Sequence, residues 1–593
     1  MNTDSLLVAF VTWFVLAFFV LLNGGYLLLN LFSLRAMKPA FAAALLLMTS
    51  SAQAAWLQVC PATSAPAGAP RAALPGPGER VVVASASAAL PGCRALPLGV
   101  DASQVEALYP LAPQDKPART ILLYGPLDGK RFAPGSHDLP QPDPAGATPR
   151  REPMPLRTNL LPDARVRTFG VEERVAIAHA NGKLRIVCRA GSRAAGVLLD
   201  GAWYMPLASS SLGADYAASG AFSVQVADAA SAARESSHAV GELGVSSSRR
   251  STGLPLPAQL DRHGWRQFVI LCPQEAATLE LDSLRLEPAA AKAAPRSTWI
   301  WDRSEWMERG DALLAWARRE AIGELFIVVT LDGPKVRNPA QLRAFVRKAH
   351  AAGIAVTSVE GDPHMVLPNH RAATADRARA FAAYNRAAAP EERLRAMQFD
   401  VEPYLLPDAV LAPADRDRAY LAMARALREA AGDMAIDYVV PFWWWDKTEL
   451  LDGLARVADG LAVMDYRTAP DQIYGFAARF LDWSAQHGKR VHIALEAGRV
   501  APERQRRYVR ADANEAGDLL LAQAGEVPVL VLLRQPVKSA SASLYRFSSE
   551  RTLDGSATSF HGNKAALRRL LPELERDLAA WPGFAGIALH GWR

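Results

Sequence analysis

The sequence has few cysteines and little net charge of either sign. Its 593 residues include four cysteines, and 66 basic against 60 acidic residues leave a net charge of +6. No CxxC or Cys/His spacing indicates a zinc site, and we expect neither a metal nor a cofactor. The basic residues are scattered rather than gathered in a stripe, which argues against nucleic acid as a partner. Nothing in the composition predicts the oligomeric state.

All four cysteines, Cys60, Cys93, Cys188 and Cys272, precede residue 290. An even number of cysteines in an exported protein permits two disulfides, with three possible connectivities. Among these we expect Cys60–Cys93 and Cys188–Cys272.

Long apolar runs are confined to the N-terminal end of the sequence, before Trp56. Residues 6–34 are long enough to span a bilayer as a transmembrane helix. Residues 41–48, preceded by Lys38 and followed by Ala52-Gln53-Ala54, have the features of a signal peptide starting at Met37. Whether the first helix is retained as a membrane anchor or translation begins at Met37, the rest of the chain is expected outside the cytoplasm, periplasmic or secreted.

A chain of this length needs more than one hydrophobic core. After the membrane or signal segment (1–55), residues 56–79 are rich in Pro and Ala and predict a linker. Residues 80–290 contain short alternating strands, which are typical of an all-β sandwich or jelly roll. The strands 267–271 and 278–286, with Trp265 before them, resemble the end of carbohydrate-binding jelly rolls.

From residue 298 to 593 short apolar strands alternate with amphipathic helices, which predicts an α/β TIM barrel. A β-rich insertion is expected at about 500–560. The predicted barrel strands are 299–302, 325–331, 355–360, 396–402, 435–441, 460–466, 491–496 and 586–590.

The ends of these strands are rich in carboxylates and aromatic side chains, and in such barrels the strand ends form the reactive face. Paired carboxylates suit hydrolysis of a glycosidic bond, and indoles suit stacking on sugar rings. The expected catalytic residues are Asp400, Glu402, Asp465, Tyr466 and Glu496. The expected substrate-binding residues are Trp299, Asp302, Asp332, Glu360, Asp362, Trp443, Trp444, Trp445, His590 and Trp592.

The sharpest motif is Asp400-Val401-Glu402, because strand alternation places both acids on one side, facing the barrel mouth. Neighbouring carboxylates raise each other's pKa, so one of them can stay protonated near neutral pH. We therefore expect this pair to supply the general acid.

Asp-x-Glu at strand four, with Met464-Asp465-Tyr466 at strand six and Trp592 after strand eight, resembles the family-18 chitinases. The resemblance implies that Glu402 is the acid, that Asp400 and Tyr466 support a substrate acetamido group, and that Trp592 floors the sugar subsite. The longer acidic motif of that family is incomplete, because Arg395 and Gln398 replace its two earlier acids.

A second resemblance is to the clan of retaining glycosidases with an acid/base Glu on strand four and a nucleophilic Glu on strand seven. Glu402 and Glu496 occupy those two places, although Val401 replaces the Asn that usually precedes the acid.

These observations predict an exported or membrane-anchored hydrolase of a polysaccharide, such as an exopolysaccharide or a cell-wall glycan, including those with amino sugars. One alternative is a protein that binds polysaccharide on a glycosidase scaffold without cleaving it. Another is a metal-dependent polysaccharide deacetylase that uses the loop from Glu360 through Asp362 and His364 to His370.

Overall fold

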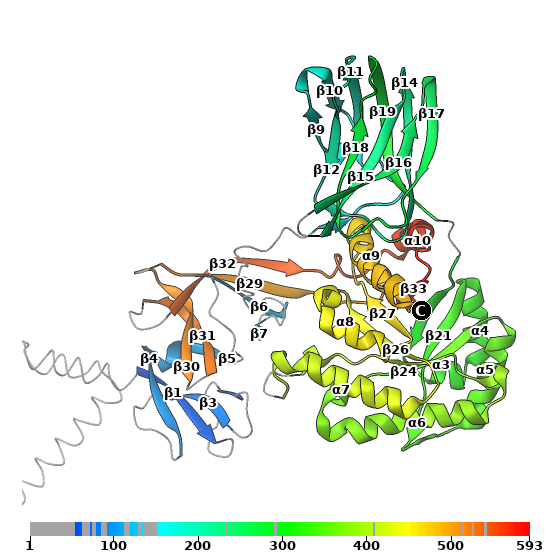
Figure 1. Ribbon diagram of the computed structural model, residues 1–593. Helices are drawn as coiled ribbons and strands as arrows, with labels where there is room; N and C mark the ends of the chain where they lie inside the picture. Colours follow the sequence, from blue (N-terminus) through cyan, green and yellow to red (C-terminus); the bar gives the residue numbers. More distant parts are fainter. Residues whose placement is uncertain are drawn as a thin grey trace, which may run out of the picture. The chain divides into compact units, whose positions relative to one another are not determined.

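The computed structural model describes residues 54–61, 71–73, 79–84, 92–111, 119–127, 133–134 and 151–593, the last range without 232–233, 290–292, 407–409, 513, 525–526 and 539–542. The chain divides into two compact units (Figure 1). The first comprises the described residues within 1–121 and 508–548, and the second comprises those within 122–507 and 549–593.

The first unit joins segments from opposite parts of the sequence. A four-stranded sheet has the order β2-β3-β1-β4, from β1 (Ala54–Pro61), β2 (Arg71–Ala73), β3 (Glu79–Ala84) and β4 (Arg94–Asp101). The Cys60–Cys93 disulfide, as expected, links the end of β1 to the residue before β4. The apolar side chains Leu57 and Val81 of this sheet share a core with Leu520 and Val531, which come from near the other end of the sequence.

A seven-stranded sheet of order β5-β31-β30-β32-β29-β6-β7 uses the segment that we predicted as an insertion. Its strands are β5 (Val105–Pro110), β6 (Thr120–Pro126), β7 (Ala133–Pro134), β29 (Glu503–Arg510), β30 (Gly517–Ala524), β31 (Val527–Val537) and β32 (Ser543–Leu553). β31 pairs antiparallel with β5, and Leu530 lies opposite Tyr109. Residues 503–553 therefore complete a sheet that begins near the N-terminal end of the described chain.

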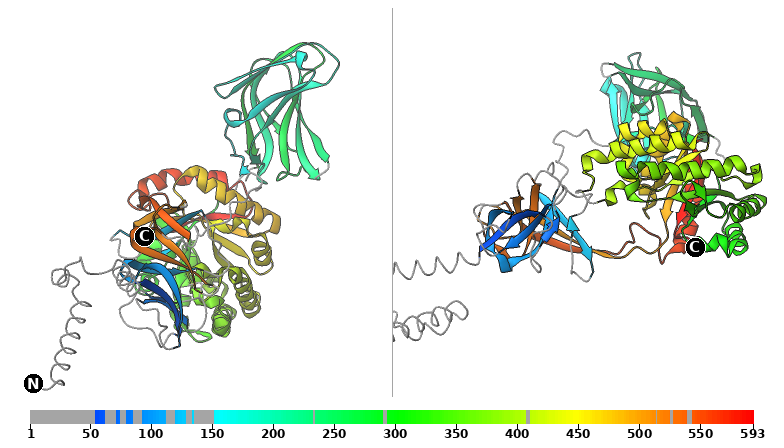
Figure 2. Two further views of the ribbon diagram at one scale, coloured as in Figure 1. Left: turned by 90° about the vertical axis from the view of Figure 1, so that its left-hand side faces the viewer. Right: turned by 90° about the horizontal axis from the view of Figure 1, so that it is seen from below.

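In the second unit, residues 165–288 form a sandwich of two five-stranded antiparallel sheets (Figure 2). One sheet has the order β10-β11-β19-β14-β17 and the other β16-β15-β18-β12-β9. The strands are β9 (Arg165–Gly170), β10 (Val175–Ala180), β11 (Lys183–Cys188), β12 (Ala195–Asp200), β14 (Ser209–Ala218), β15 (Phe222–Ser231), β16 (Arg234–Leu243), β17 (Ser246–Pro255), β18 (Trp265–Leu271) and β19 (Ala277–Pro288).

Alternation explains the sandwich core. In β11 every second residue is buried, including Leu184 and Ile186, while Lys183 and Arg185 are exposed. The expected Cys188–Cys272 disulfide connects the end of β11 to the residue after β18 and thus links the two sheets.

The second unit also contains a closed parallel barrel of eight strands, one for each predicted barrel strand. The strands are β20 (Arg296–Ile300), β21 (Ile322–Val328), β24 (Ala355–Glu360), β25 (Met397–Phe399), β26 (Ile436–Pro441), β27 (Gly460–Met464), β28 (Arg490–Glu496) and β33 (Phe584–His590). The helices outside it are α3 (Ser304–Met307), α4 (Gly310–Arg319), α5 (Pro339–Ala351), α6 (Arg371–Ala387), α7 (Pro413–Ala431), α8 (Thr448–Ala455), α9 (Pro470–His487) and α10 (Lys564–Leu578).

The predicted fold class is nevertheless wrong for the chain as a whole. Strands account for 44% of the structure and helices for 28%, so the protein is mainly β with one parallel barrel. The region 80–290 is not one sandwich, because β3 to β7 join the two sheets described first. Pattern alone shows that strands are present, but not which distant strand each will pair with.

The predicted membrane segment precedes the part of the chain that the structure describes. Within the residues that the structure describes, no helix is both long and apolar enough to cross a membrane. The apolar runs at 6–34 and 41–48 lie outside the described residues.

Candidate active site

Asp400 follows β25 directly, at the end of the barrel where the strands finish. Its backbone N–H donates to the carbonyl oxygen of Glu360 on the neighbouring strand, at 2.7 Å. A Cβ atom on Gly361 would lie 2.3 Å from the Asp400 carbonyl oxygen, so only glycine permits this approach. The pair of strand ends therefore fixes the backbone from which Asp400 projects.

The carboxyl group of Asp400 favours protonation. Burial, and then the negative charge of Glu402, raise its pKa to about 7, although His590 opposes this shift. Its Oδ1 atom is buried and has no hydrogen-bond partner within the described part of the chain. A carboxyl group in such surroundings is close to half-protonated at neutral pH.

Glu402 is held by the tyrosine two residues later. The short helix η7 (Pro403–Leu405) begins immediately after Glu402, and the Tyr404 hydroxyl donates to Glu402 Oε2. The Tyr404 ring packs edge-on against Trp443, with centroids 5.3 Å apart. Burial and the charge of Glu402 raise the Tyr404 pKa, so its hydroxyl remains a donor.

Glu496 ends β28 and is buried, but it has two donors. His590 Nδ1 lies 2.6 Å from Glu496 Oε2, and the Gly498 N–H donates to Oε1 at 2.5 Å. Burial alone would raise the pKa of Glu496, but the His590 contact and backbone N–H groups outweigh it and lower the pKa. Glu496 is thus ionised under conditions in which Asp400 still holds a proton.

His590 lies between this carboxylate and an indole. The Trp301 Nε1–H donates to His590 Nε2 at 2.9 Å, which requires that nitrogen to be unprotonated. Burial lowers the pKa of His590, but Glu496, Asp400 and Glu402 together raise it. The carboxylates favour the charged ring, whereas the Trp301 contact requires an unprotonated Nε2. The hydrogen bonds are those of the neutral ring, with its proton on Nδ1 facing Glu496.

Tyr466 lies among the three carboxylates. Burial raises its pKa, and the charges of Asp400, Glu496 and Glu402 raise it further. Its ring centroid is 6.0 Å from that of His590. The structure therefore gathers Asp400, Glu402, Glu496, Tyr466 and His590, five residues that the sequence predicted for this site.

Trp299 lies deeper in the barrel. Its Nε1–H donates to Gln398 Oε1 at 2.7 Å, and its ring is 5.9 Å from that of His590. Asp465 is fully buried, and no described residue forms a hydrogen bond to either of its carboxylate oxygens; burial raises its pKa. The charge of Arg467 opposes this rise.

Four predicted carboxylates have local partners instead. Asp302 accepts from the Ser304 N–H, Asp332 from Arg337, and Asp362 from the His364 N–H. Glu360 is buried and paired with Arg377 at 2.5 Å. None of the four is among the charges that shift the pKa of Asp400.

The tryptophans predicted to bind substrate lie in different parts of the barrel. Trp443 adjoins Tyr404, whereas Trp444 is buried against Tyr420. Trp592 is not a floor beneath the carboxylates, because its Nε1–H donates to Glu320 at 3.2 Å and its ring lies against Arg568.

Trp445 belongs to a different part of the second unit. Its ring lies 4.0 Å from the Arg479 guanidinium and lines a separate cavity.

Three groups of the site were missed from the sequence: Trp301, Tyr404 and Gly498. Trp301 stands two residues after Trp299, so strand alternation could have placed it on the same side. Tyr404 belongs to the Asp-x-Glu-Pro-Tyr segment but follows a proline turn, where alternation gives no direction. Gly498 acts through its backbone and leaves no side-chain signal.

Among the described residues, no group of three or more His, Cys, Asp and Glu side chains could hold a metal ion. In the loop proposed for a deacetylase, His364 and His370 have ring centroids 5.8 Å apart, but Glu360 pairs with Arg377. The loop does not gather a ligand set.

Comparisons with known proteins give structural neighbours only. No protein-family model matches the sequence. No curated protein matches it either.

A family 29 carbohydrate-binding module is 13% identical, covers 23% of this chain and 88% of its own, and has a TM-score of 0.18. A complex of such a module with mannohexaose has 13% identity, coverages of 23% and 89%, and a TM-score of 0.19. The CBM22-1–GH10 modules of a Clostridium thermocellum endo-1,4-beta-D-xylanase, bound to xylohexaose, have 11% identity, coverages of 58% and 81%, and a TM-score of 0.25. Similarity of this extent assigns no activity to the chain.

Proposed function

We propose that the barrel hydrolyses glycosidic bonds of a polysaccharide. The observation that carries this proposal is the opposite shift of two carboxyl pKa values in one barrel mouth. The pKa of Asp400 is raised to about 7, while that of Glu496 is lowered. One proton donor and one carboxylate are the two groups that glycoside hydrolysis requires.

The Asp400–Glu402 pair supplies the proton. With Asp400 protonated and Glu402 bonded by Tyr404, the pair can donate one proton to the glycosidic oxygen as its bond to the anomeric carbon breaks. In this proposal Asp400 holds the proton, and Glu402, oriented by Tyr404, passes it to the substrate as the acid.

Glu496 faces the developing positive charge of the sugar. Ionised and oriented by His590 and Gly498, it can stabilise or attack the anomeric carbon. Water then adds its hydroxyl group to that carbon and returns a proton to the acid pair. In amino-sugar glycans the substrate's acetamido group could perform the attack, with Tyr466 beside it.

The location agrees with a polymeric substrate outside the cytoplasm. Two disulfides fit an oxidising compartment. The aromatic residues Trp301 and Trp443 border the acids and offer faces for sugar rings. We propose an exopolysaccharide or cell-wall glycan as substrate.

One observation favours a second candidate, polysaccharide binding without cleavage. Both oxygens of Glu496 already accept hydrogen bonds, and Glu402 accepts one from Tyr404. Carboxylates held in this way can act as fixed acceptors for sugar hydroxyls.

The test uses the full chain and a panel of purified polysaccharides, with release of new reducing ends as the measurement. Glu402→Gln, Asp400→Asn and Glu496→Gln should each lower turnover by about 100- to 10,000-fold, because each removes a group needed in the transition state. Asp311→Asn, at an exposed carboxylate of α4 that pairs with Lys348, is the matched control and should retain full turnover. Undiminished turnover in Glu402→Gln would contradict the proposal, and binding without turnover by the unsubstituted protein would favour the second candidate.

A further inference from the structure

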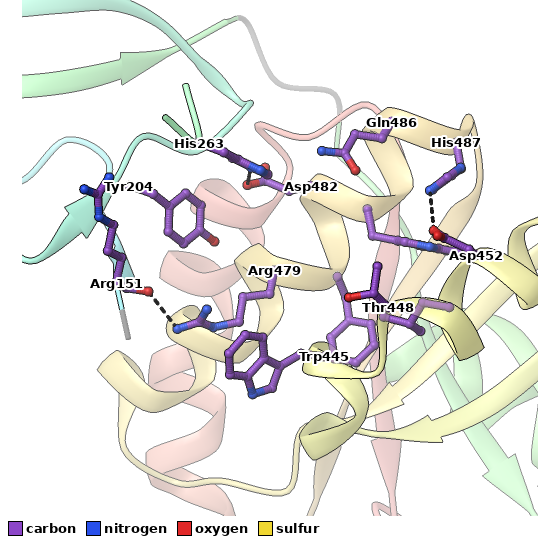
Figure 3. A pocket seen from close by; sticks show the side chains of 13 residues that line it. Arg151, Tyr204, His263, Trp445, Thr448, Asp452, Arg479, Asp482, Gln486 and His487 are labelled. Atoms are coloured by element: carbon purple, nitrogen blue, oxygen red, sulfur yellow. Dashed lines mark hydrogen bonds and ion pairs between the residues drawn. The ribbon is translucent and has the colours of Figure 1, made fainter. Parts of the chain in front are cut away.

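A cavity of about 440 Å³ lies in the second unit, between the sandwich and the outside of the barrel (Figure 3). We call it the junction cavity. Its lining includes Arg151, Tyr204, His263, Trp445, Arg479 and Trp483. Its volume falls within the roughly 300–1,000 Å³ range of small-molecule sites. No acid of the barrel mouth is among its lining residues.

Buried hydrogen bonds give the cavity its walls. Asp482 of α9 is buried and accepts from the Leu207 N–H at 2.9 Å and from Trp581 Nε1–H at 2.7 Å. Its other oxygen lies 2.9 Å from His263 Nε2. One turn earlier in α9, Arg479 bonds to Glu152 at 2.9 Å. The walls are thus fixed by contacts that do not use the interior.

Two polar groups on the lining have no hydrogen-bond partner among the residues that the structure describes. Tyr204 is only 8% exposed and Trp483 only 7%, yet neither the Tyr204 hydroxyl nor the Trp483 Nε1–H has a hydrogen-bond partner. Figure 3 shows the Tyr204 hydroxyl directed into the space beside Asp482 and Arg479. A buried donor without an acceptor is costly, so both groups call for a ligand that supplies acceptors.

Most charged side chains that line the cavity form ion pairs, but Arg151 forms none with the described residues. Asp482 is paired with His263, Asp452 with His487 at 3.9 Å, and Arg479 with Glu152. Arg151 donates to the Trp265 carbonyl oxygen at 2.6 Å, but among the described residues no carboxylate forms an ion pair with it. Burial, and then the charge of Arg266, lower the pKa of Arg151, so a neighbouring negative charge would favour its charged form. An anion in the cavity would stabilise the charged guanidinium of Arg151.

The apolar lining suits a ring with C–H faces. Trp445 carries the Arg479 guanidinium 4.0 Å from its ring centre, and Tyr204 packs edge-on against His263 with centroids 5.0 Å apart. Aromatic side chains combined with a few directed donors are the usual lining of a sugar site.

We propose that the junction cavity is a second saccharide site, which binds a carboxylated sugar, a hexuronate, of a polysaccharide. The sugar carboxylate pairs with Arg151, and its hydroxyl oxygens accept from Tyr204 and Trp483. The site binds without cleaving and does not depend on hydrolysis at the barrel mouth.

The test is calorimetric titration of the full chain with glucuronate, and with glucose as its neutral counterpart. We expect saturable binding of glucuronate and at least tenfold weaker binding of glucose. Tyr204→Phe and Arg151→Gln should each weaken glucuronate binding by about tenfold or more, the effect of one lost hydrogen bond to a charged ligand. Asp400→Asn should leave this affinity unchanged, which separates the cavity from the barrel mouth.

Thermal midpoints distinguish a binding role from a structural one. Tyr204→Phe deletes a hydroxyl that bonds to nothing, so the midpoint should stay the same or rise while affinity falls. Tyr384→Phe is the matched control: its buried hydroxyl donates to the Glu392 carbonyl oxygen at 2.9 Å, so it should lower the midpoint and leave affinity intact. Affinity unchanged in Tyr204→Phe, glucose bound as well as glucuronate, or no glucuronate binding below about 10 mM would each overturn the proposal.

Discussion

The two ends of the barrel contain similar residues in different surroundings. At the end where the strands begin, Glu324 and Asp437 are buried and both pair with Arg395. Thr357 donates to Glu324 at 2.6 Å, and His492 lies 3.4 Å from it. At the mouth, by contrast, Asp400 faces Glu402 and no arginine contributes to its pKa shift.

The difference shows how the same side chain becomes structural or reactive. Burial raises the pKa of Glu324, but His492 and Arg395 outweigh it and keep the pKa well below its usual range. For Asp400, burial and a like charge act in the same direction. A buried acid beside an arginine stabilises the fold, whereas a buried acid beside another acid stores a proton.

Replacing Arg395 should have the largest effect on stability. Arg395→Gln leaves two buried carboxylates without their cation and should lower the free energy of unfolding by about 3–5 kcal/mol. Denaturant unfolding measures this, with Arg318→Gln on the exposed face of α4 as control, expected within about 0.5 kcal/mol of the original. Equal stability of the two variants would remove the contrast between the barrel ends.

Replacing Asp400, the buried acid at the mouth, should raise the free energy of unfolding rather than lower it. Since the pKa of Asp400 is raised to about 7, the native protein loses stability as pH rises from about 4 to 7, where only the unfolded chain has released this proton. Asp400→Asn lacks this loss and should therefore gain relative stability over that interval, by up to roughly 4 kcal/mol at pH 8.

Unfolding curves of both proteins at pH 4 and pH 8 give this difference directly. A stability difference that does not change with pH would mean that Asp400 titrates normally.

The smallest predicted effect concerns His590. It lowers the pKa of Glu496, so His590→Asn should raise that pKa and shift the acidic limb of the pH–activity profile upward by about one unit. His487→Asn, outside the barrel mouth, should leave the profile in place. An unshifted limb in His590→Asn would show that Glu496 does not control it.

The sequence predicted the barrel strands and the meeting of Asp400, Glu402, Glu496, Tyr466 and His590. Strand ends in a closed parallel barrel converge on one rim, so the position of a residue at a strand end is enough to place it there. Glu402 and Tyr466 lie three and two positions beyond their strands and still reach the mouth. Asp302 and Asp362, each two positions beyond a strand, accept hydrogen bonds from nearby backbone N–H groups instead. Local hydrogen bonding decided their direction, and strand position could not.

The junction cavity and the sheet pairing of the first unit could not be predicted from the sequence. Tyr204 and Trp483 lie far apart in the sequence, and only packing of the sandwich on α9 brings them to one cavity. Similarly, β31 reads as an ordinary apolar strand, with no local feature that selects β5 as its partner.

That pairing has a consequence for biosynthesis. Val105–Pro110 leaves the ribosome early, but its sheet partner, Val527–Val537, is made only after seven of the eight barrel strands. Closing so long a loop is slow, and domains fold as units once their segments are present. The first unit therefore cannot be completed until nearly all of the barrel has been synthesised, and a chain ending at residue 500 would leave β5 without its partner strand.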